Sequence, residues 1–512
     1  EVNITSSNVE YSEGEGFVLT FSIDAGKRYR FSKIFANISD ALDTDAFLDL
    51  EPEFSKLAGK YYSQRKLNSV LEKIDKLSEQ KELQFINHSV TETLDGDNVE
   101  VKINIFEGEK FIIERINIVG NSITNDSVIR GEMIVDEGDP FSTLLVNKSI
   151  NQIKGRNIFG IVEQKTLDGS SPDMKILEIS VEEKATGEIM AGAGFGTDGT
   201  SFQFAVSENN WLGRGVKLQS ALNLSPDKIS GNILVNNPNY NFSGNAVHAG
   251  LDVSSTDRSS ASGFKSSRTG FNLGTAFEQY EDIFISPEIV TSFEDIEVDS
   301  TASDAIKKME GNFFNIDLGY GITQDKRNQV FKPTEGYITT FRQSLPLVQD
   351  SSSLLNSFDI SGYHDFSEDL IGSLKFHAKS IHGIDDDVRL TNRLFLPRSR
   401  LRGFNVLKVG PKDGEDYIGG NYNASLGFEA MLPNLLPEST RTDVSFFLDT
   451  GNVWEVDYSS TLDDSNTIRT SAGVAVNWFT VVGPLNFSLA TPLTKNSTDK
   501  TEGFRFNLGT TF

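Results

Sequence analysis

Residues 314–320 read Phe-Asn-Ile-Asp-Leu-Gly-Tyr, and in this stretch apolar residues alternate with polar residues or glycine. Successive side chains of a β-strand point to opposite faces, so a strand here has one apolar and one polar face. The same alternation occurs at residues 374–379 and 485–490. Similar stretches follow one another from residue 187 onward, separated by clusters of Asn, Asp, Gly and Ser. This pattern is typical of a membrane β-barrel with lipid outside and water inside.

The alternating region extends from residue 187 to residue 512. A soluble β-sandwich would alternate in the same way, but it would rarely need so long a single piece. A membrane strand takes roughly 9–11 residues. At about 20 residues per strand and connection, the region predicts an all-β transmembrane antiparallel barrel of about 16 strands. The chain ends on one more alternating stretch, which contains Phe504, Phe506 and Phe512.

The composition excludes several classes of partner and chemistry. Lys and Arg number 47 against 73 Asp and Glu, which gives a net charge of −26, and there is no Cys. An acidic surface repels phosphate backbones, so we expect no nucleic-acid partner. The absence of Cys excludes disulfides, thiolate zinc sites and cysteine nucleophiles. The sequence also lacks the run of about 18 apolar residues that indicates a transmembrane helix.

The first third of the chain contains a repeated pattern. Alternating strands at residues 17–23, 99–105 and 177–181 each lead into a charged segment, and their spacing of roughly 80 residues indicates tandem small domains. Residues 128–133 and 144–153 read as two short helices between the last two strands. A helix between the first two strands has its apolar side chains on one face: Leu67, Val70, Leu71, Ile74 and Leu77. Each unit is therefore expected to contain a strand, two helices and two strands.

These repeats resemble POTRA domains, the periplasmic modules that precede outer-membrane assembly barrels. The resemblance rests on INIVGNSITNDSVIRGEM at residues 116–133 and EGDPFSTLLVNKSINQIKGRNIF at residues 137–159. Taken alone, the region also fits an unrelated α+β repeat. The resemblance implies an N-terminally truncated chain with four parts: the C-terminal part of a truncated POTRA domain at 1–26, a POTRA domain at 27–109, the last POTRA domain at 110–186, and the barrel at 187–512.

Several barrel motifs resemble the outer-membrane β-barrel assembly factors of the POTRA-plus-barrel superfamily, also called the surface antigen family. They are WLGRG (211–215), YGITQDKRNQVFKPTEGY (320–337), LRGF (401–404), FFLDTGNVW (446–454) and GPLNFSLATPL (483–493). Two departures concern Leu401, where the family usually has Val, and residues 480–481, where it commonly has Ser-Pro. Neither departure changes Arg402.

The parity of two strands places two carboxylates in the barrel lumen. Phe446 and Leu448 belong to the apolar set of one strand, so Asp449 has the opposite, lumenal parity. The same argument places Glu429 of the preceding strand inside. The resemblance implies that the turn Arg402-Gly403-Phe404 lies on a long extracellular loop that folds back into the barrel. We predict that Arg402 pairs with Glu429 and Asp449 and that Gly403 permits the close approach. The alternative is that the three charges face water and contribute little.

The first barrel strand, at residues 187–196, is rich in glycine. Gly192, Gly194 and Gly196 weaken it because glycine loses more entropy on folding and gives neighbours nothing to pack on. Its expected partner is the terminal strand, with Phe504, Phe506 and Phe512. A weak seam opens sideways and exposes backbone groups that capture another strand by β-augmentation. The alternative is that the glycines only relieve crowding at a curved corner.

Catalytic motifs are absent from the sequence. The Gly194-x-Gly196-x-x-Gly199 pattern precedes an alternating strand, whereas a dinucleotide site requires a helix there. The five histidines do not have metal-ligand spacing, and no nucleophile elbow occurs. We therefore expect no enzyme activity, no cofactor and no metal.

The family resemblance implies that the chain assembles and inserts β-barrel proteins into the outer membrane, with its POTRA domains in the periplasm. The implied partners are unfolded β-barrel clients, periplasmic assembly lipoproteins and outer-membrane lipid. No nucleotide is available there, so we expect the driving force to be the client's own burial in lipid and strand closure. Two alternatives stay open. One is a relative that serves translocation, autotransporter assembly or two-partner secretion, and the other is a passive porin, which predicts a strong closed seam.

Overall fold

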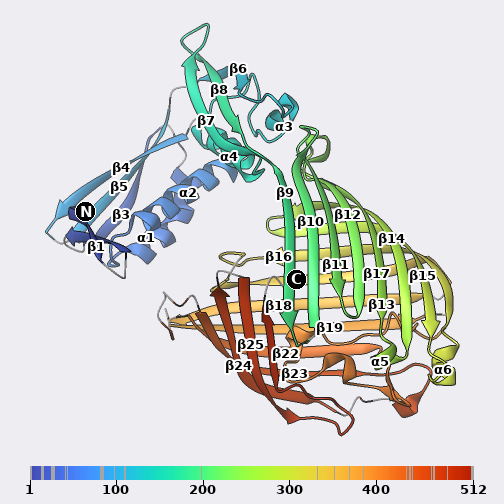
Figure 1. The fold of residues 1–512 in the computed structure, drawn as a ribbon. Helices are drawn as coiled ribbons and strands as arrows, with labels where there is room; N and C mark the ends of the chain where they lie inside the picture. The colour runs from blue at the N-terminus through green and yellow to red at the C-terminus, as the bar shows by residue number, and fades with distance from the viewer. Residues whose placement is uncertain are drawn as a thin grey trace. The chain divides into compact units, whose positions relative to one another are not determined.

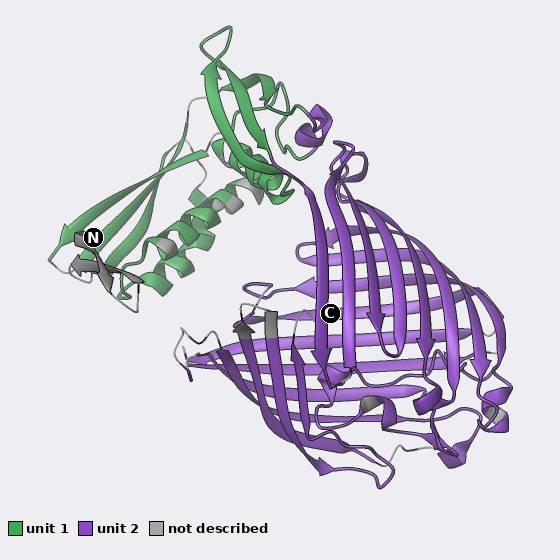
Figure 2. Cartoon of the chain, viewed as in Figure 1, with its two compact units in different colours: residues 1–122, 132–183 green, residues 123–131, 184–512 purple. Residues whose placement is uncertain are grey.

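The computed structural model describes residues 3–508 except 13–15, 25–28, 41, 43, 81–85, 97, 109–110, 198, 331, 351, 368, 385, 434, 437–439, 441, 463, 465–466 and 481–482. The chain divides into two compact units (Figure 2). Residues 1–122 and 132–183 form the first unit, and residues 123–131 and 184–512 form the second.

The first unit begins with an antiparallel hairpin of β1 (Asn3–Ser12) and β2 (Gly16–Asp24). The first repeat follows, with β3 (Arg30–Ile38), the 3-10 helix η1 (Thr44–Leu50), α1 (Glu51–Leu57), α2 (Gln64–Gln80), β4 (Ile86–Asp95) and β5 (Asn98–Glu107). Its sheet has the order β3-β5-β4. The apolar face of α2 packs on this sheet, and the buried core includes Phe31, Leu67, Val70, Ile74, Val101 and Ile103.

The second repeat has the same succession of a strand, two α-helices and two strands. It comprises β6 (Ile112–Val119), α3 (Asp126–Arg130), α4 (Thr143–Gly155), β7 (Phe159–Asp168) and β8 (Met174–Glu183), with the sheet order β6-β8-β7. The helix predicted at residues 128–133 ends earlier in the structure. α3 ends before Gly131, because glycine does not favour helix. The α4 helix begins after Ser142, whose hydroxyl accepts a hydrogen bond from the Leu145 amide. The predicted strand, two helices and two strands are thus present in both repeats.

Sixteen strands in the described part of the second unit close an antiparallel barrel (Figure 1). Each strand pairs with its neighbours in the chain, and β26 pairs with β9 to close the barrel. This confirms the predicted barrel of about 16 strands. The strands are β9 (Gly187–Gly196), β10 (Gly199–Trp211), β11 (Val216–Ser225), β12 (Lys228–Asn237), β13 (Ala246–Asp257), β14 (Phe264–Tyr280), β15 (Ile283–Val298), β16 (Gly311–Asp325), β17 (Gly336–Gln349), β18 (Ser353–Ser367), β19 (Leu370–Gly383), β22 (Tyr422–Leu432), β23 (Thr442–Trp454), β24 (Arg469–Thr480), β25 (Gly483–Thr494) and β26 (Phe504–Leu508).

The barrel is apolar outside because the alternation seen in the sequence sorts its side chains. On β16, Phe314 is exposed on the outer face, whereas its neighbour Asn315 is buried. On β19, Leu374 is exposed and Ser373 is buried. No helix in the described ranges is both long and apolar enough to cross a membrane.

The long connections gather at one end of the barrel. Because the strands alternate in direction, the connections after β9, β11, β13, β15, β17, β19, β23 and β25 share one end, which we call the loop end. The longest of them, residues 384–421, contains the short strands β20 (Lys412–Asp413) and β21 (Asp416–Tyr417). The neighbouring connections contain α5 (Ser259–Ser262) and α6 (Asp304–Lys307). A buried apolar cluster joins these loops, formed by Phe264, Ile296, Ala302, Ile306, Leu390, Ile418 and Val456.

Candidate functional site

Two adjacent strands present carboxylates to the lumen. In the pairing of β22 with β23, Gly427 lies opposite Asp449 and Glu429 lies opposite Phe447. The outward-facing Phe428 and Leu448 are 47% and 45% exposed, whereas the Asp449 side chain is 1% exposed. Asp449 is therefore a buried charge that needs a cationic partner or several hydrogen bonds.

Arg402 supplies that partner from the 384–421 loop. Its Nε and Nη2 donate to the two Asp449 carboxylate oxygens, each at 2.8 Å, and its backbone amide donates to Asp449 Oδ2 at 3.1 Å. Its Nη1 donates to Glu429 Oε1 at 3.3 Å. The paired contact to Asp449 is the bidentate geometry that makes arginine–carboxylate interactions strong and directional. The structure thus brings together the three residues for which the sequence predicted a pairing.

Gly403 and Phe404 occupy a close-packed position beside this ion pair. Gly403 has a φ of +88°, and a Cβ added there would lie 3.0 Å from the Ala490 Cβ. Glycine suits this position because other residues rarely adopt such a φ. Phe404 is 3% exposed and packs in a cluster with Leu396, Leu401, Val409 and Val453.

Four further residues contact Arg402 or its partner Glu429, and the sequence reasoning did not assign them to this site. The Phe447 ring lies under the guanidinium, with its centroid 3.6 Å from Cζ. Ser471 donates its hydroxyl to the Arg402 carbonyl. Glu429 also accepts from Lys375 Nζ at 3.1 Å and from the Ser445 hydroxyl at 2.7 Å. The parity that placed Asp449 inside could have found Phe447 and Ser445, but it gives no indication of which loop residue each wall residue meets.

Other arginines of the same loop contact acidic side chains in a similar way. Arg400 Nη2 lies 2.9 Å from Asp359 Oδ1 on β18, and Arg389 lies near Glu294 on β15. Arg393, whose side chain is fully buried, pairs with Asp457 in the connection after β23. Burial raises the pKa of Asp457, but the Arg393 charge and the Val388 amide lower it more, so the pKa lies below its ordinary value.

The seam between β26 and β9 is described only as far as Leu508. From Gly187 to Gly196, β9 has ten residues in register with β10. Within the described part of β26, only Asn507 and Leu508 are in register with β9, opposite Gly196 and Phe195. The Thr197 amide also donates to the Phe506 carbonyl at 3.2 Å, and the Phe195 and Phe506 rings lie 5.9 Å apart.

The predicted seam residues are distributed unevenly over this closure. Gly196 touches β26 closely, because an added Cβ would lie 2.6 Å from the Phe506 carbonyl oxygen. Gly192 and Gly194 are in register with β10. On the other side, Phe504 and Phe506 are in register with Leu489 and Phe487 of β25. Phe512 lies outside the described residues.

The described side chains do not indicate a metal site. Among the residues that the structure describes, no group of three or more His, Asp or Glu could hold a metal ion.

Comparison with known proteins relates this geometry to a family. Residues 111–184 match the POTRA family, described as a surface antigen variable number repeat. The outer membrane protein assembly factor BamA of Neorickettsia risticii (strain Illinois) is 26% identical over 517 residues, covering 98% of this chain and 69% of that protein. BamA of Neisseria meningitidis serogroup B is 24% identical over 555 residues, covering 96% and 68%. The chain therefore spans about two thirds of the length of these relatives.

Two solved structures share the fold. The crystal structure of BamA from Haemophilus ducreyi lacking POTRA domains 1–3 aligns with a TM-score of 0.71 at 20% identity, covering 94% of this chain and 100% of that one. CdiB from Acinetobacter baumannii aligns with a TM-score of 0.53 at 10% identity, covering 95% and 91%. The barrel itself matches the Omp85 superfamily domain over residues 210–512, more than half of the sequence. Together with the POTRA match this confirms the family inferred from the sequence motifs, and the chain belongs to the Omp85 superfamily.

Proposed function

We propose that this protein assembles β-barrel proteins and inserts them into the outer membrane. The barrel would lie in the outer membrane, and residues 27–109 and 110–186 would act as periplasmic POTRA domains that receive unfolded clients. The relatives that match nearly the whole chain are named outer membrane protein assembly factors, which supports this proposal. No catalytic step, cofactor or nucleotide is part of it.

The observation that carries the proposal is the glycine-rich strand β9 at the closure of the barrel. β9 is in register with β10 over ten residues on one side and meets the last strand, β26, on the other. Opening the side toward β26 exposes the backbone donors and acceptors of β9. In hydrocarbon each unsatisfied backbone group costs several kcal/mol, so an incoming client strand that pairs with β9 is strongly favoured.

The 384–421 loop would act as an anchor for the wall of the barrel that contains β22 and β23. Arg402 ties the 384–421 loop to β22 and β23 through Glu429 and Asp449. These contacts would keep that wall of the barrel rigid while β9 releases and re-pairs. Periplasmic assembly lipoproteins would bind the POTRA domains, and outer-membrane lipid would surround the apolar outer face.

A cross-linking experiment tests the proposal, because the natural chain has no cysteine. Ala193 lies on the exposed face of β9, so Ala193→Cys reports on strands that pair with the seam-side edge of β9. The purified full chain in vesicles would receive an unfolded barrel protein with single cysteines along its last strand. We expect a disulfide at one register of that strand, since the bond requires Cβ atoms roughly 4 Å apart.

Phe204→Cys is the matched control. Phe204 is exposed on the same face, but β10 is paired on both sides, with β9 and β11. Equal cross-linking at both positions, or none at Ala193 with a folded barrel, contradicts the insertion mechanism. Export of a soluble cargo without a cross-link would favour the secretion alternative, and steady ion conductance alone would favour the porin.

A further inference from the structure

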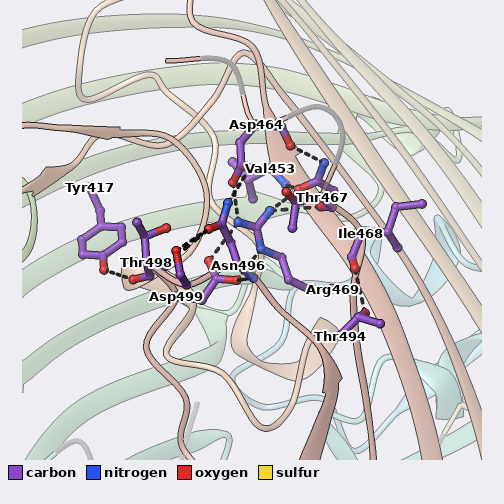
Figure 3. Close-up of polar contacts among 12 residues, drawn as sticks. Tyr417, Val453, Asp464, Thr467, Ile468, Arg469, Thr494, Asn496, Thr498 and Asp499 are labelled. Atoms are coloured by element: carbon purple, nitrogen blue, oxygen red, sulfur yellow. Dashed lines mark hydrogen bonds and ion pairs between the residues drawn. The ribbon is translucent and has the colours of Figure 1, made fainter. Parts of the chain in front are cut away.

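A second buried arginine, Arg469, is surrounded by polar partners (Figure 3). Arg469 is the first residue of β24 and is 0% exposed. Its Nε and Nη2 donate to the two carboxylate oxygens of Asp499 at 2.9 Å and 2.8 Å. The Asp499 side chain is also 0% exposed. Arg469 further donates to Asp464 and Asn452.

Asp499 lies in the connection between β25 and β26, residues 495–503, which we call the terminal loop. Within it, Asp499 Oδ2 accepts from the Asn496 amide at 2.7 Å, and Asn496 Nδ2 donates to Asp464 Oδ1 at 3.1 Å. Arg469 and its acidic partners therefore hold the terminal loop to β24 and to the connection before it. The two buried charges satisfy each other through two parallel hydrogen bonds, the geometry that most strongly fixes relative position.

The terminal loop also pairs with the segment that carries the Arg402 anchor. The Asn405 amide donates to the Lys500 carbonyl at 2.9 Å, and the Lys500 amide donates to the Lys408 carbonyl at 3.1 Å. The Glu502 amide donates to the Gly403 carbonyl at 2.9 Å. The backbone of the terminal loop is thus held against residues 403–408 in the manner of a short β-ladder.

The seam strand begins directly after this ladder. β26 starts at Phe504, and its first contact with the other side of the seam is the bond from Thr197 to Phe506. Any displacement of Glu502 moves the start of β26, because only one residue separates them. The terminal loop is consequently the shared element between the Arg402 anchor and the seam.

We propose that Arg469 is a positioning residue that couples the Arg402 anchor to the seam. By holding Asp499, it keeps the terminal loop paired with residues 403–408 and thereby keeps β26 in register with β9. Release of the Arg469–Asp499 pair frees the loop end of the seam. The mechanistic meaning of this coupling rests on the proposed function, but the coupling itself is a property of the barrel without a client.

Two measurements on the purified full chain in vesicles test the coupling. The first is the rate of disulfide formation between Phe195→Cys and Leu508→Cys, which are register partners across the seam. We expect Arg469→Ala to slow this rate about fivefold or more, the range of a typical coupling between two sites. The same oxidation between Ala193→Cys and Phe202→Cys, register partners within the β9–β10 hairpin, should keep its rate.

The second measurement is hydrogen exchange at the amides of Asn405 and Glu502. Arg469 has no described bond to either residue. A purely local effect of losing its side chain would therefore leave both amides protected from exchange. We expect Arg469→Ala to accelerate both amides together with the loss of seam cross-linking. Arg469→Lys, which keeps the charge and loses the bidentate contact, should produce a smaller change in the same direction. If Arg469→Ala does not fold, the measurements on Arg469→Lys test the coupling.

Arg393→Ala is the matched control. Arg393 is an equally buried arginine in an ion pair, but its partners Asp457 and Asn421 lie outside the terminal loop. It should leave both the seam rate and the two amides unchanged. A seam rate in the Arg469 variants within twofold of wild type, or equal slowing by Arg393→Ala, overturns the coupling. Failure of the wild-type chain to insert a client overturns the proposed function and leaves the coupling to be judged by these two measurements.

Discussion

The two strands that meet at the seam are held in opposite ways. β26 follows the terminal loop, which Arg469 and residues 403–408 fix from two sides. β9 carries Gly192, Gly194 and Gly196 on its lumenal face, where they offer neighbouring side chains nothing to pack on. One edge of the seam is therefore anchored and the other is compliant. A barrel that has to open at one place can confine the movement to β9 and retain a rigid wall at β22 to β26.

The largest effect is expected on the anchored side, from Asp449→Ala. This change leaves the Arg402 guanidinium half-buried without its bidentate partner, which costs about 3–5 kcal/mol. The free energy of unfolding in urea, measured in detergent, should fall accordingly. Asp443→Ala is the control on the same strand, because Asp443 pairs with the partly exposed Lys332 and should cost about 1 kcal/mol or less. Equal losses of unfolding free energy in the two variants would mean that the Arg402–Asp449 pair contributes no more than the Lys332–Asp443 pair.

A smaller loss is expected from Gly403→Ala. The new Cβ would adopt a φ of +88° and press against Ala490, so we expect a cost of about 1–3 kcal/mol. Gly414 in the same loop has a φ of +61° with nothing within 4 Å of an added Cβ. Gly414→Ala therefore measures the backbone cost alone, about 1 kcal/mol. The difference between the urea midpoints of the two variants measures the cost of the contact with Ala490. Equal midpoints would refute the argument that close packing requires glycine at position 403.

The contrast between strands and loops also explains what the sequence could predict. Alternation determines which face of a strand is lumenal, so strand parity alone was enough to place Asp449 and Glu429 inside the barrel. The partner of Asp449 came from the family resemblance, because nothing local in residues 401–404 indicates where a long loop folds. The Arg469–Asp499 pair was missed for the same reason. Its residues lie at a strand end and in a loop, where side-chain periodicity carries no information.

The seam register was also beyond sequence reasoning. Glycine content predicts that β9 is weak, and this stays a prediction. The ladder between the terminal loop and residues 403–408 sets where β26 starts, and thereby which of its residues meet β9. The helix boundary at Gly131 shows the same limit on a smaller scale, since apolar periodicity continued past a residue that ends the helix.

On the compliant side, Gly192→Ala should have a modest effect of the opposite sign. Replacing a strand glycine by alanine stabilises the strand by about 0.5–1 kcal/mol, and this would slow release of β9. Gly231→Ala on β12 is the control, because its added Cβ has only ordinary contacts and β12 lies away from the seam. We expect both variants to gain stability in urea and only Gly192→Ala to cross-link more slowly to a client strand. Equal cross-linking in the two would argue against compliance of β9 as the cause of opening.

The smallest effect concerns the pH dependence of the loop end. The folded pKa of Asp457 lies below its ordinary value of 3.8, because the Arg393 charge and the Val388 amide outweigh its burial. A lowered folded pKa contributes stability that is present above pH 3.8 and is lost as the pH falls through the folded value. The gap in urea midpoint between wild type and Asp457→Asn should therefore stay constant from neutral pH down to about pH 5 and close only below pH 4. A gap that closes near neutral pH would mean that the folded pKa of Asp457 is raised, which would contradict stabilisation of its charge by Arg393 and the Val388 amide.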